Sequence, residues 1–452
     1  MTADLPLAPR SLPIFGHMPA LLFGSPWDVT ERWLREGGKN VRMNLIGGEW
    51  LATRDLEVIR HILVQNPGNY LKDASSLGVF RDILGSGVLT SDGELWRRHR
   101  AILGKAFRID ALRDVPRITG RAVERLFARW DQAADAGAIV DVGDAFRILT
   151  LEVIAEATLG MEPDRCDAIF PRLYEPLVAE CNRRVWHPYR AWLPSPTRRR
   201  YRRCLAELNE FLRDLIHERR ALLRASPREP VDMLDMLLLG VAELPWTGAL
   251  AELVCDELKT MLFAGHDTSS AMLTWTVHAL SRRPELLQRL QAEADRVLPG
   301  GSIPEYEALR ALEFSQACLK EALRLYNIVP VVTRVADRDD RAGEVEIAAG
   351  TRIMIHIQAV HLDPEHWPDP GRFDPDRFLG GQGTGYRWLP FITGSRSCVG
   401  QHFSLLEAKI VLALLGQRYE LLPQPGNGDE RHRFHAPIAP RSPIRMQVRR
   451  RS

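Results

Sequence analysis

The stretch Phe391-Ile-Thr-Gly-Ser-Arg-Ser-Cys-Val-Gly400 lies near the C-terminus of the 452-residue chain. It holds a single cysteine between two glycines and leads directly into an apolar helical run from His402. A cysteine just before a helix N-terminus lies near the positive end of the macrodipole and near free backbone N–H groups, and both favour the thiolate. The glycines permit a bend and a close approach that a Cβ would block. The pattern indicates a buried thiolate that donates to a soft or redox-active metal.

This stretch resembles the haem-binding loop of the cytochrome P450 family, Phe-x-x-Gly-x-Arg-x-Cys-x-Gly, and Gly394 and Gly400 complete the match. In haem enzymes of that type a cysteine thiolate is the proximal iron ligand. The resemblance implies that Cys398 binds the iron of haem b (iron protoporphyrin IX), that Arg396 pairs with a haem propionate, and that Phe391 packs beside the sulfur. The alternative is a buried structural cysteine in a glycine turn.

Composition indicates a globular protein with a large core, since 45% of the residues are hydrophobic and 26% are charged. The net charge of +2 gives no reason to expect nucleic acid or an anionic membrane as a partner. The six cysteines form no C-x-x-C pair, which favours a reducing compartment and a cytoplasmic location. Asp4, Arg10 and several prolines interrupt the first apolar residues, so we expect neither a signal peptide nor a membrane span.

The pattern along the chain predicts one mainly helical domain with small sheets over residues 1–452. A long helix is expected over residues 245–283, with Thr247 as N-cap and apolar residues on most faces, as in a buried central helix. Short strands are expected at residues 331–335, 344–347 and 352–356. Residues 66–93, rich in glycine, serine and aspartate, are predicted to form a long ordered loop of functional importance. The resemblance covers essentially the full chain and implies a cytochrome P450 fold, with the long helix over a buried haem.

The middle of the long helix reads Ala264-Gly-His-Asp-Thr268. Glycine costs up to about 1 kcal/mol in a helix interior, and an acid in an apolar stretch is unfavourable unless it is paired. A threonine hydroxyl can bond to the carbonyl one turn back and loosen the helix, opening a groove beside a ligand. The stretch resembles the family's oxygen-activating pattern, which implies that Ala264 lies beside the haem, that Thr268 manages oxygen and that Asp267 relays protons. The alternative is a helix kink without chemistry.

Glu321 and Arg324 place opposite charges on one helix face. The same spacing recurs elsewhere in pairs typical of a solvated surface, so only the position of this pair, ahead of the strands and the segment 373–378, distinguishes it. The resemblance implies that Glu321, Arg324 and Arg377 form a buried charge network that holds the proximal loop. Asn327 departs from the proline usual at its position, which weakens any inference about the substrate.

Trp96 and Arg100 share one face of the helix that follows the loop, and an indole N–H with a guanidinium suits a carboxylate. The resemblance implies that these two residues, with Arg334 and Arg396, bind the haem propionates. Taken one at a time, such arginines are more often surface residues. The arginine-rich run at residues 198–203 is a candidate nucleic-acid or membrane patch, but the simpler interpretation is a solvated helix start.

The resemblance implies a haem-thiolate monooxygenase that inserts one atom of O2 into an apolar small molecule, such as a terpenoid, fatty acid or polyketide. Electrons are expected from a separate ferredoxin and ferredoxin reductase, with Arg97, Arg98 and Arg108 as a basic docking face. The alternatives are a haem-thiolate isomerase or peroxygenase, and a haem-binding sensor without turnover. The residues that the resemblance alone places beside the substrate are Phe80, Leu84, Val88, Met261, Ala264 and Val332.

Overall fold

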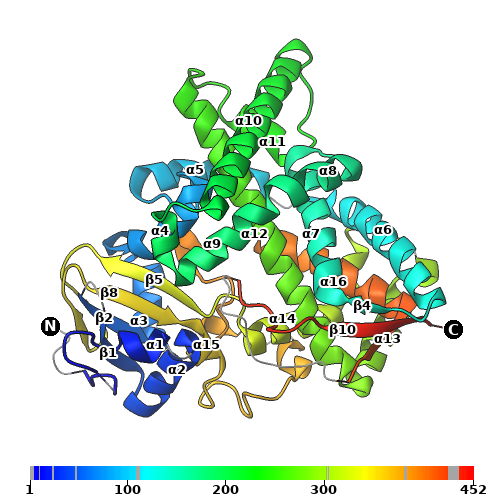
Figure 1. Cartoon of the computed structure of the whole chain (residues 1–452). Helices are drawn as coiled ribbons and strands as arrows, with labels where there is room; N and C mark the ends of the chain where they lie inside the picture. The colour runs from blue at the N-terminus through cyan, green and yellow to red at the C-terminus, as the bar shows by residue number, and fades with distance from the viewer. Residues whose placement is uncertain are drawn as a thin grey trace. The chain divides into compact units, whose positions relative to one another are not determined.

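The computed structural model describes residues 5–9, 11–22, 25–45, 48–107, 112–301, 303, 305–380, 384–425 and 437–451. The chain forms two compact units, one of residues 1–76 with 320–398 and one of residues 77–319 with 399–452. The first unit contains a five-stranded sheet, and the second contains most of the helices (Figure 1). The chain is therefore mainly helical with small sheets, as the sequence predicts.

The first unit is built on a sheet with the strand order β1-β2-β8-β5-β3, in which only β2 and β8 are parallel. Apolar side chains such as Leu51 and Ile353 cover one another and Ile59 of α3, which makes one continuous core. The elements of this unit are α1 (Met18–Leu22), α2 (Pro26–Gly37), β1 (Asn40–Leu45), β2 (Gly48–Thr53), α3 (Leu56–Arg60), β3 (Tyr70–Lys72), β5 (Val331–Ala336), β6 (Asp340–Ala342), β7 (Val345–Ile347), β8 (Arg352–His356) and α15 (Ile357–His361). The three strands expected after residue 330 are confirmed as β5, β7 and β8.

The second unit surrounds the helix α12, which lies against α7, α10 and α16 (Figure 1). Its elements are α5 (Gly93–Ala106), α6 (Val115–Asp135), β4 (Ile139–Asp141), α7 (Val142–Leu159), α8 (Pro163–Leu173), α9 (Glu175–Trp186), α10 (Pro196–Ala225), α11 (Met233–Gly240), α12 (Gly248–Ser281), α13 (Pro284–Val297), α16 (Gln401–Arg418), β9 (Tyr419–Pro423) and β10 (Arg445–Arg450). Two further helices, α4 (Ala74–Leu84) and α14 (Glu313–Tyr326), cross the division between the units.

Helix α12 begins where the sequence predicts. The Thr247 hydroxyl accepts a hydrogen bond of 3.2 Å from the backbone N–H of Leu250, so Thr247 is the N-cap. The helix ends before Pro284, which starts α13. Most of its side chains are buried on all faces, which confirms the expectation of a buried helix.

The prediction of a long loop over residues 66–93 is wrong, because this segment contains β3 and α4. The Asp73 carboxylate accepts hydrogen bonds from the N–H and the hydroxyl of Ser75, which supports the first turn of α4. The apolar residues Leu77, Phe80 and Leu84 then recur at helical spacing. The abundance of serine and glycine hid this periodicity.

The arginine-rich run lies on the first turns of α10, where the Ser195 hydroxyl accepts a hydrogen bond of 3.1 Å from the N–H of Arg198. Most of its arginines are exposed, whereas Tyr201 is buried under the guanidinium of Arg184, 3.9 Å from the ring centroid. This arrangement is that of a solvated helix start with one buried anchor.

Candidate active site

The loop that leads to Cys398 is bent at a glycine. A 3-10 turn covers Gly394–Arg396, and the N–H of Cys398 donates to the carbonyl of Phe391 at 3.0 Å. At Gly394 φ is +78°, and a Cβ there would lie 2.0 Å from the carbonyl oxygen of Leu63. Any larger residue would collide with this backbone, so the close approach requires glycine.

Cys398 is exposed, whereas the other five cysteines are buried. Burial raises the pKa of Cys166 and Cys181 to about 12 and that of Cys255 to about 11, so these groups stay thiols. The expectation of a buried sulfur at Cys398 is wrong for this structure, since a sulfur that binds a metal must be reachable. Gly400 is the N-cap residue of α16 with φ of −87°, a conformation open to any residue, so its backbone does not require glycine.

Two of the predicted propionate-binding arginines are attached to the same edge of the sheet. Arg396 Nη1 donates to the backbone carbonyls of Pro67, at 3.2 Å, and Tyr70. Arg334 is on β5, pairs in register with Lys72 of β3, and is buried. The structure therefore brings two guanidinium groups to the β3–β5 edge, where a carboxylate can be recognised by both.

The Glu321–Arg324 pair is fully buried and bidentate. Arg324 Nε and Nη2 donate to the two carboxylate oxygens of Glu321 at 2.7 and 2.8 Å. Arg377 Nε lies 3.5 Å from Glu321 Oε1, and the N–H of Asp374 donates to the same oxygen at 2.8 Å. Arg324 Nη1 also donates to the carbonyl of His361 at 2.8 Å. This cluster connects α14 to the segment that precedes the Cys398 loop.

Asn327 belongs to this network, although its place in the sequence does not indicate it. Its side-chain N–H donates to the carbonyl of Arg324 at 2.7 Å, and its oxygen lies 2.7 Å from Nδ1 of His361. The N–H of Leu389 donates to His361 Nε2 at 2.8 Å, so Nε2 accepts and Nδ1 must carry the hydrogen. Burial, assisted by the charge of Arg324, lowers the pKa of His361 to about 3 and keeps the ring neutral.

The second unit carries the helix turn with Asp267 and Thr268. Thr268 Oγ1 donates to the carbonyl of Ala264 at 2.6 Å, as the sequence suggested, and Ala264 itself is exposed in an otherwise buried helix. On the other side a Cβ at Gly265 would meet the side chain of Ile154 at 2.8 Å, so the glycine lets α7 approach closely. The turn is thus open on one side and tightly packed on the other.

Trp96 and Arg100 are half-buried on α5. Between them His99 is 1% exposed and forms an ion pair with the buried Glu257 of α12. Burial raises the pKa of Glu257 despite the opposing effect of His99. This buried pair, which sequence reasoning missed, fixes the rotation of α5 and hence the direction of Trp96 and Arg100.

The predicted substrate residues are distributed between α4, α12, β5 and the connection after α4. Phe80 and Phe263 pack edge to face with ring centroids 5.6 Å apart. Phe80, Val88 and Val332 are half-buried, whereas Leu84 and Met261 are buried in packed surroundings. The backbone N–H of Ser86 donates to Asp256 at 2.7 Å, which holds the connection after α4 on α12.

Glu407 of α16 is a further residue that sequence reasoning missed. Its side chain is 1% exposed, and neither carboxyl oxygen has an aligned hydrogen-bond partner among the described residues. Burial raises the pKa of Glu407 to about 8, and the nearby hydroxyl of Ser269 lowers it only slightly. Glu407 is therefore mostly a neutral acid at pH 7. Nothing in its local sequence, an ordinary helical stretch, distinguishes it.

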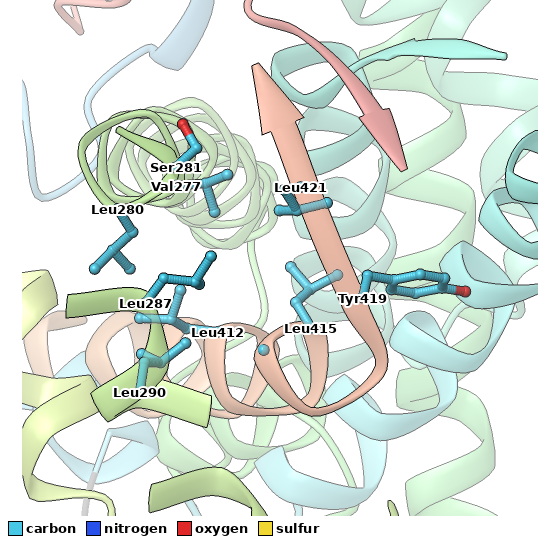
Figure 2. A pocket seen from close by; sticks show the side chains of 10 residues that line it. Val277, Leu280, Ser281, Leu287, Leu290, Leu412, Leu415, Tyr419 and Leu421 are labelled. Carbon is cyan, nitrogen blue, oxygen red and sulfur yellow. The ribbon is translucent and has the colours of Figure 1, made fainter. Parts of the chain in front are cut away.

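An apolar cavity of about 20 Å³ lies in the second unit, lined by residues of α12, α13, α16 and β9 (Figure 2). Leu280, Leu290, Leu412 and Leu415 point into it. This volume accommodates about one water molecule, and the lining offers such a molecule few polar partners. The cavity is a packing defect and is too small to bind a substrate.

The residues of the Cys398 loop fit an iron porphyrin. Within the described residues no group of three or more His, Cys, Asp or Glu could hold a bare metal ion. Haem iron needs a single axial ligand from this side, which an exposed thiolate supplies. The guanidinium groups of Arg334 and Arg396 suit the carboxylates of the porphyrin. The donor set therefore matches a haem better than a bare metal ion.

Comparison with known proteins gives a consistent result. The family model described as Cytochrome P450 matches residues 6–446. Cyclooctat-9-en-7-ol 5-monooxygenase of Streptomyces melanosporofaciens is 31% identical over 93% of this chain and 90% of its own length. Secologanin synthase 1 of Catharanthus roseus is 30% identical over 80% of this chain and 72% of its own length.

Among solved structures, the cytochrome P450DA heme domain is similar to this chain with a TM-score of 0.87 and 25% sequence identity. The similarity covers 99% of this chain and 98% of that chain. No helix in the described part of the chain is both long and apolar enough to cross a membrane.

Proposed function

Because the chain belongs to the cytochrome P450 family, and is a cytochrome P450 monooxygenase with the haem-thiolate cofactor of that family, we propose that Cys398 is the axial ligand. The observation that carries this assignment is the exposure of Cys398 alone among the cysteines, on a loop bent at Gly394. When bound, the haem supplies the redox chemistry by which O2 is activated and one oxygen atom is transferred to a small molecule. The organisation as a single domain over residues 1–452 stays a prediction.

The chain's own residues would hold the haem and its surroundings in place. Arg334, Arg396, Trp96 and Arg100 would donate hydrogen bonds to the propionates, and Phe391 would pack beside the sulfur. Gly394 and Gly400 complete the loop, and Ala264 would line the haem face of α12. Glu321, Arg324 and Arg377 would act at a distance by fixing the segment that enters the loop.

Asp267 and Thr268 would handle protons and oxygen. The Thr268 hydroxyl donates its hydrogen to Ala264, which leaves its oxygen lone pairs available to accept a hydrogen bond on the open side of the helix. Asp267, 15% exposed, can exchange protons with a group placed there. Conversion of Thr268 to alanine should uncouple reductant consumption from product formation. Unchanged coupling would favour an isomerase, a peroxygenase or a sensor.

The assignment of Cys398 is tested by the optical spectrum of the reduced protein with carbon monoxide. A strongly red-shifted Soret band is expected for the wild type and for Cys318→Ser, a control at a buried cysteine. The band should disappear in Cys398→Ser. A histidine-type band in the wild type, or a red-shifted band that survives Cys398→Ser, would overturn the assignment.

The substrate would be an apolar small molecule of terpenoid, fatty-acid or polyketide type. Support comes from the half-buried apolar side chains of Phe80, Val88 and Val332, and from the similar Streptomyces protein, named for an oxidation of cyclooctat-9-en-7-ol. Leu84 and Met261 would shape this site from the packed layer beneath. Titration with members of the three classes, followed by the Soret shift, distinguishes them, and Phe80→Ala should weaken binding of the right class.

Electrons would come from a ferredoxin and its reductase in the cytoplasm, a location that suits six cysteines without a disulfide. Arg97, 65% exposed, and the exposed Arg98 lie on α5 and suit an acidic partner, whereas Arg108 lies outside the described residues. Charge reversal at Arg97 and Arg98 should slow reduction and flatten its dependence on salt. Equal rates in the variant and the wild type would remove α5 as the docking face.

A further inference from the structure

His266 lies beside Asp267 in α12, and its ring is held from two sides. The imidazole is 2% exposed and packs edge to face against Tyr174, with ring centroids 5.9 Å apart. Its Nε2 lies 3.0 Å from the backbone carbonyl oxygen of Arg147. A carbonyl oxygen only accepts, so Nε2 carries a hydrogen. The hydroxyl of Thr150 donates to the His266 carbonyl at 3.1 Å and holds this turn of α12 against α7.

The other ring nitrogen faces a second acceptor. Nδ1 of His266 lies 3.2 Å from Oδ1 of Asp267 and has no aligned hydrogen-bond partner within the described residues. With the hydrogen on Nε2, a neutral ring presents a lone pair at Nδ1, opposite the lone pairs of an ionised carboxylate. Two lone pairs at this distance repel strongly in a buried site. Moving the ring hydrogen to Nδ1 only transfers the conflict to the Arg147 carbonyl.

We propose that Asp267 keeps a proton at neutral pH and donates it as a hydrogen bond to Nδ1 of His266. A small rotation of the carboxyl group aligns this bond, and both ring nitrogens are then satisfied. His266 is a positioning residue, which acts through Asp267. The inference rests on the proposed role of Asp267 as a proton relay, because it states in which form Asp267 waits.

The charged groups around the ring agree with this arrangement. Burial lowers the pKa of His266, and Arg147 on α7 acts in the same direction, whereas Asp267 and Glu175 on α9 oppose it. An imidazolium is therefore disfavoured, and the proton belongs on the carboxyl oxygen. Tyr174 does not compete for it, because burial raises the pKa of its hydroxyl well above the ordinary value.

Proton delivery then balances simply. The O–H bond of the Asp267 carboxyl breaks and its proton passes to the acceptor on the open side of the helix. The pair is left as a neutral imidazole and a carboxylate. One proton from water restores the waiting form. No oxidant, reductant or other co-reactant takes part in this exchange.

The test is infrared spectroscopy of the resting haem-loaded protein, prepared with ¹³C-labelled aspartate, at neutral pH in H2O and D2O. We expect a carboxylic C=O band that shifts with the label and in D2O, and that is absent from Asp267→Asn. In His266→Asn the amide can donate to an ionised carboxylate without a titrating proton, so the band should be lost. His278→Phe removes another buried histidine of α12 and should leave the band unchanged.

A wild-type spectrum without this band would overturn the proposal, whatever the variants do. A band that persists in His266→Asn would remove His266 from the explanation. Either result leaves the proposed function standing if Asp267→Asn still uncouples turnover. Conversely, a clear band together with unchanged coupling in Asp267→Asn would refute the relay role and keep the shared proton.

Discussion

The backbone N–H of Leu389 donates a hydrogen bond of 2.8 Å to Nε2 of His361, at the start of the segment that runs to Cys398. The ring can accept this bond only because its hydrogen is on Nδ1, directed to Asn327. One neutral histidine thus joins α15, the end of α14 and the approach to the ligand loop. This contact explains why Asn327 occurs where relatives usually carry proline.

We predict that His361→Phe destabilises the protein by about 1–3 kcal/mol for each of the two buried groups it leaves without a partner. The N–H of Leu389 and the amide of Asn327 both lose a hydrogen bond, whereas the aromatic volume is kept. The measurement is urea unfolding of the haem-loaded protein. His366→Phe, at a half-exposed histidine after α15, is the control and should unfold like the wild type. Equal stability of the two variants would contradict the role given to His361.

We predict that Glu407 makes the protein less stable as the pH rises. The pKa of Glu407 in the folded protein is about 8, above the ordinary value of 4.5, so the folded state binds the proton more tightly than the unfolded chain. Its contribution is complete below about pH 4.5 and is lost as the pH rises through about 8, by roughly 1.4 kcal/mol per unit.

Glu407→Gln keeps the shape of the neutral acid without a titrating proton. Its unfolding free energy should change less than that of the wild type between pH 5 and pH 8, and should exceed the wild-type value at pH 8. The same substitution at the exposed Glu420 on β9 should leave the pH dependence as it is. Parallel curves for Glu407→Gln and the wild type would show that Glu407 ionises normally.

The elements with strong local signals could be predicted from the sequence. Thr247 and Pro284 bound α12 because a cap and a proline act on the adjacent backbone, and the motif around Cys398 fixes the loop. The helix α4 was missed because its periodicity is weak and its first turn depends on Asp73. His99, His361 and Glu407 could not be found, since their partners are distant in sequence and a lone buried titratable residue has no pattern.

Glu321 and Arg324 illustrate the boundary between these cases. Their spacing says only that they share a helix face, whereas the structure shows both at 0% exposure with a bidentate contact. We predict that Arg324→Lys destabilises the protein by about 3–5 kcal/mol, since a single ammonium cannot replace the paired donors and leaves Glu321 partly uncompensated. The same change at the exposed Arg310, in another Glu-x-x-Arg pair, should have no measurable effect on urea unfolding. Similar midpoints for the two variants would show that the charge alone suffices.

The last prediction concerns the bend before Cys398. Gly394→Ala places a Cβ 2.0 Å from the carbonyl oxygen of Leu63, at a φ of +78° that side chains rarely adopt. The neighbour is backbone and cannot rotate away, so the loop must move, and the cost is at least the roughly 1–3 kcal/mol of a strained backbone position. We expect a lower unfolding midpoint and a weaker red-shifted Soret band per polypeptide in the carbon monoxide spectrum.

Gly371→Ala is the matched control. This glycine lies in the same unit and does not have a positive φ, and no atom of the described residues lies within 4 Å of the place that a Cβ would take. The alanine there should leave both the unfolding midpoint and the Soret band unchanged. If Gly394→Ala binds haem and unfolds like Gly371→Ala, the close approach to Leu63 does not hold the loop, and the exposure of Cys398 must depend on contacts elsewhere.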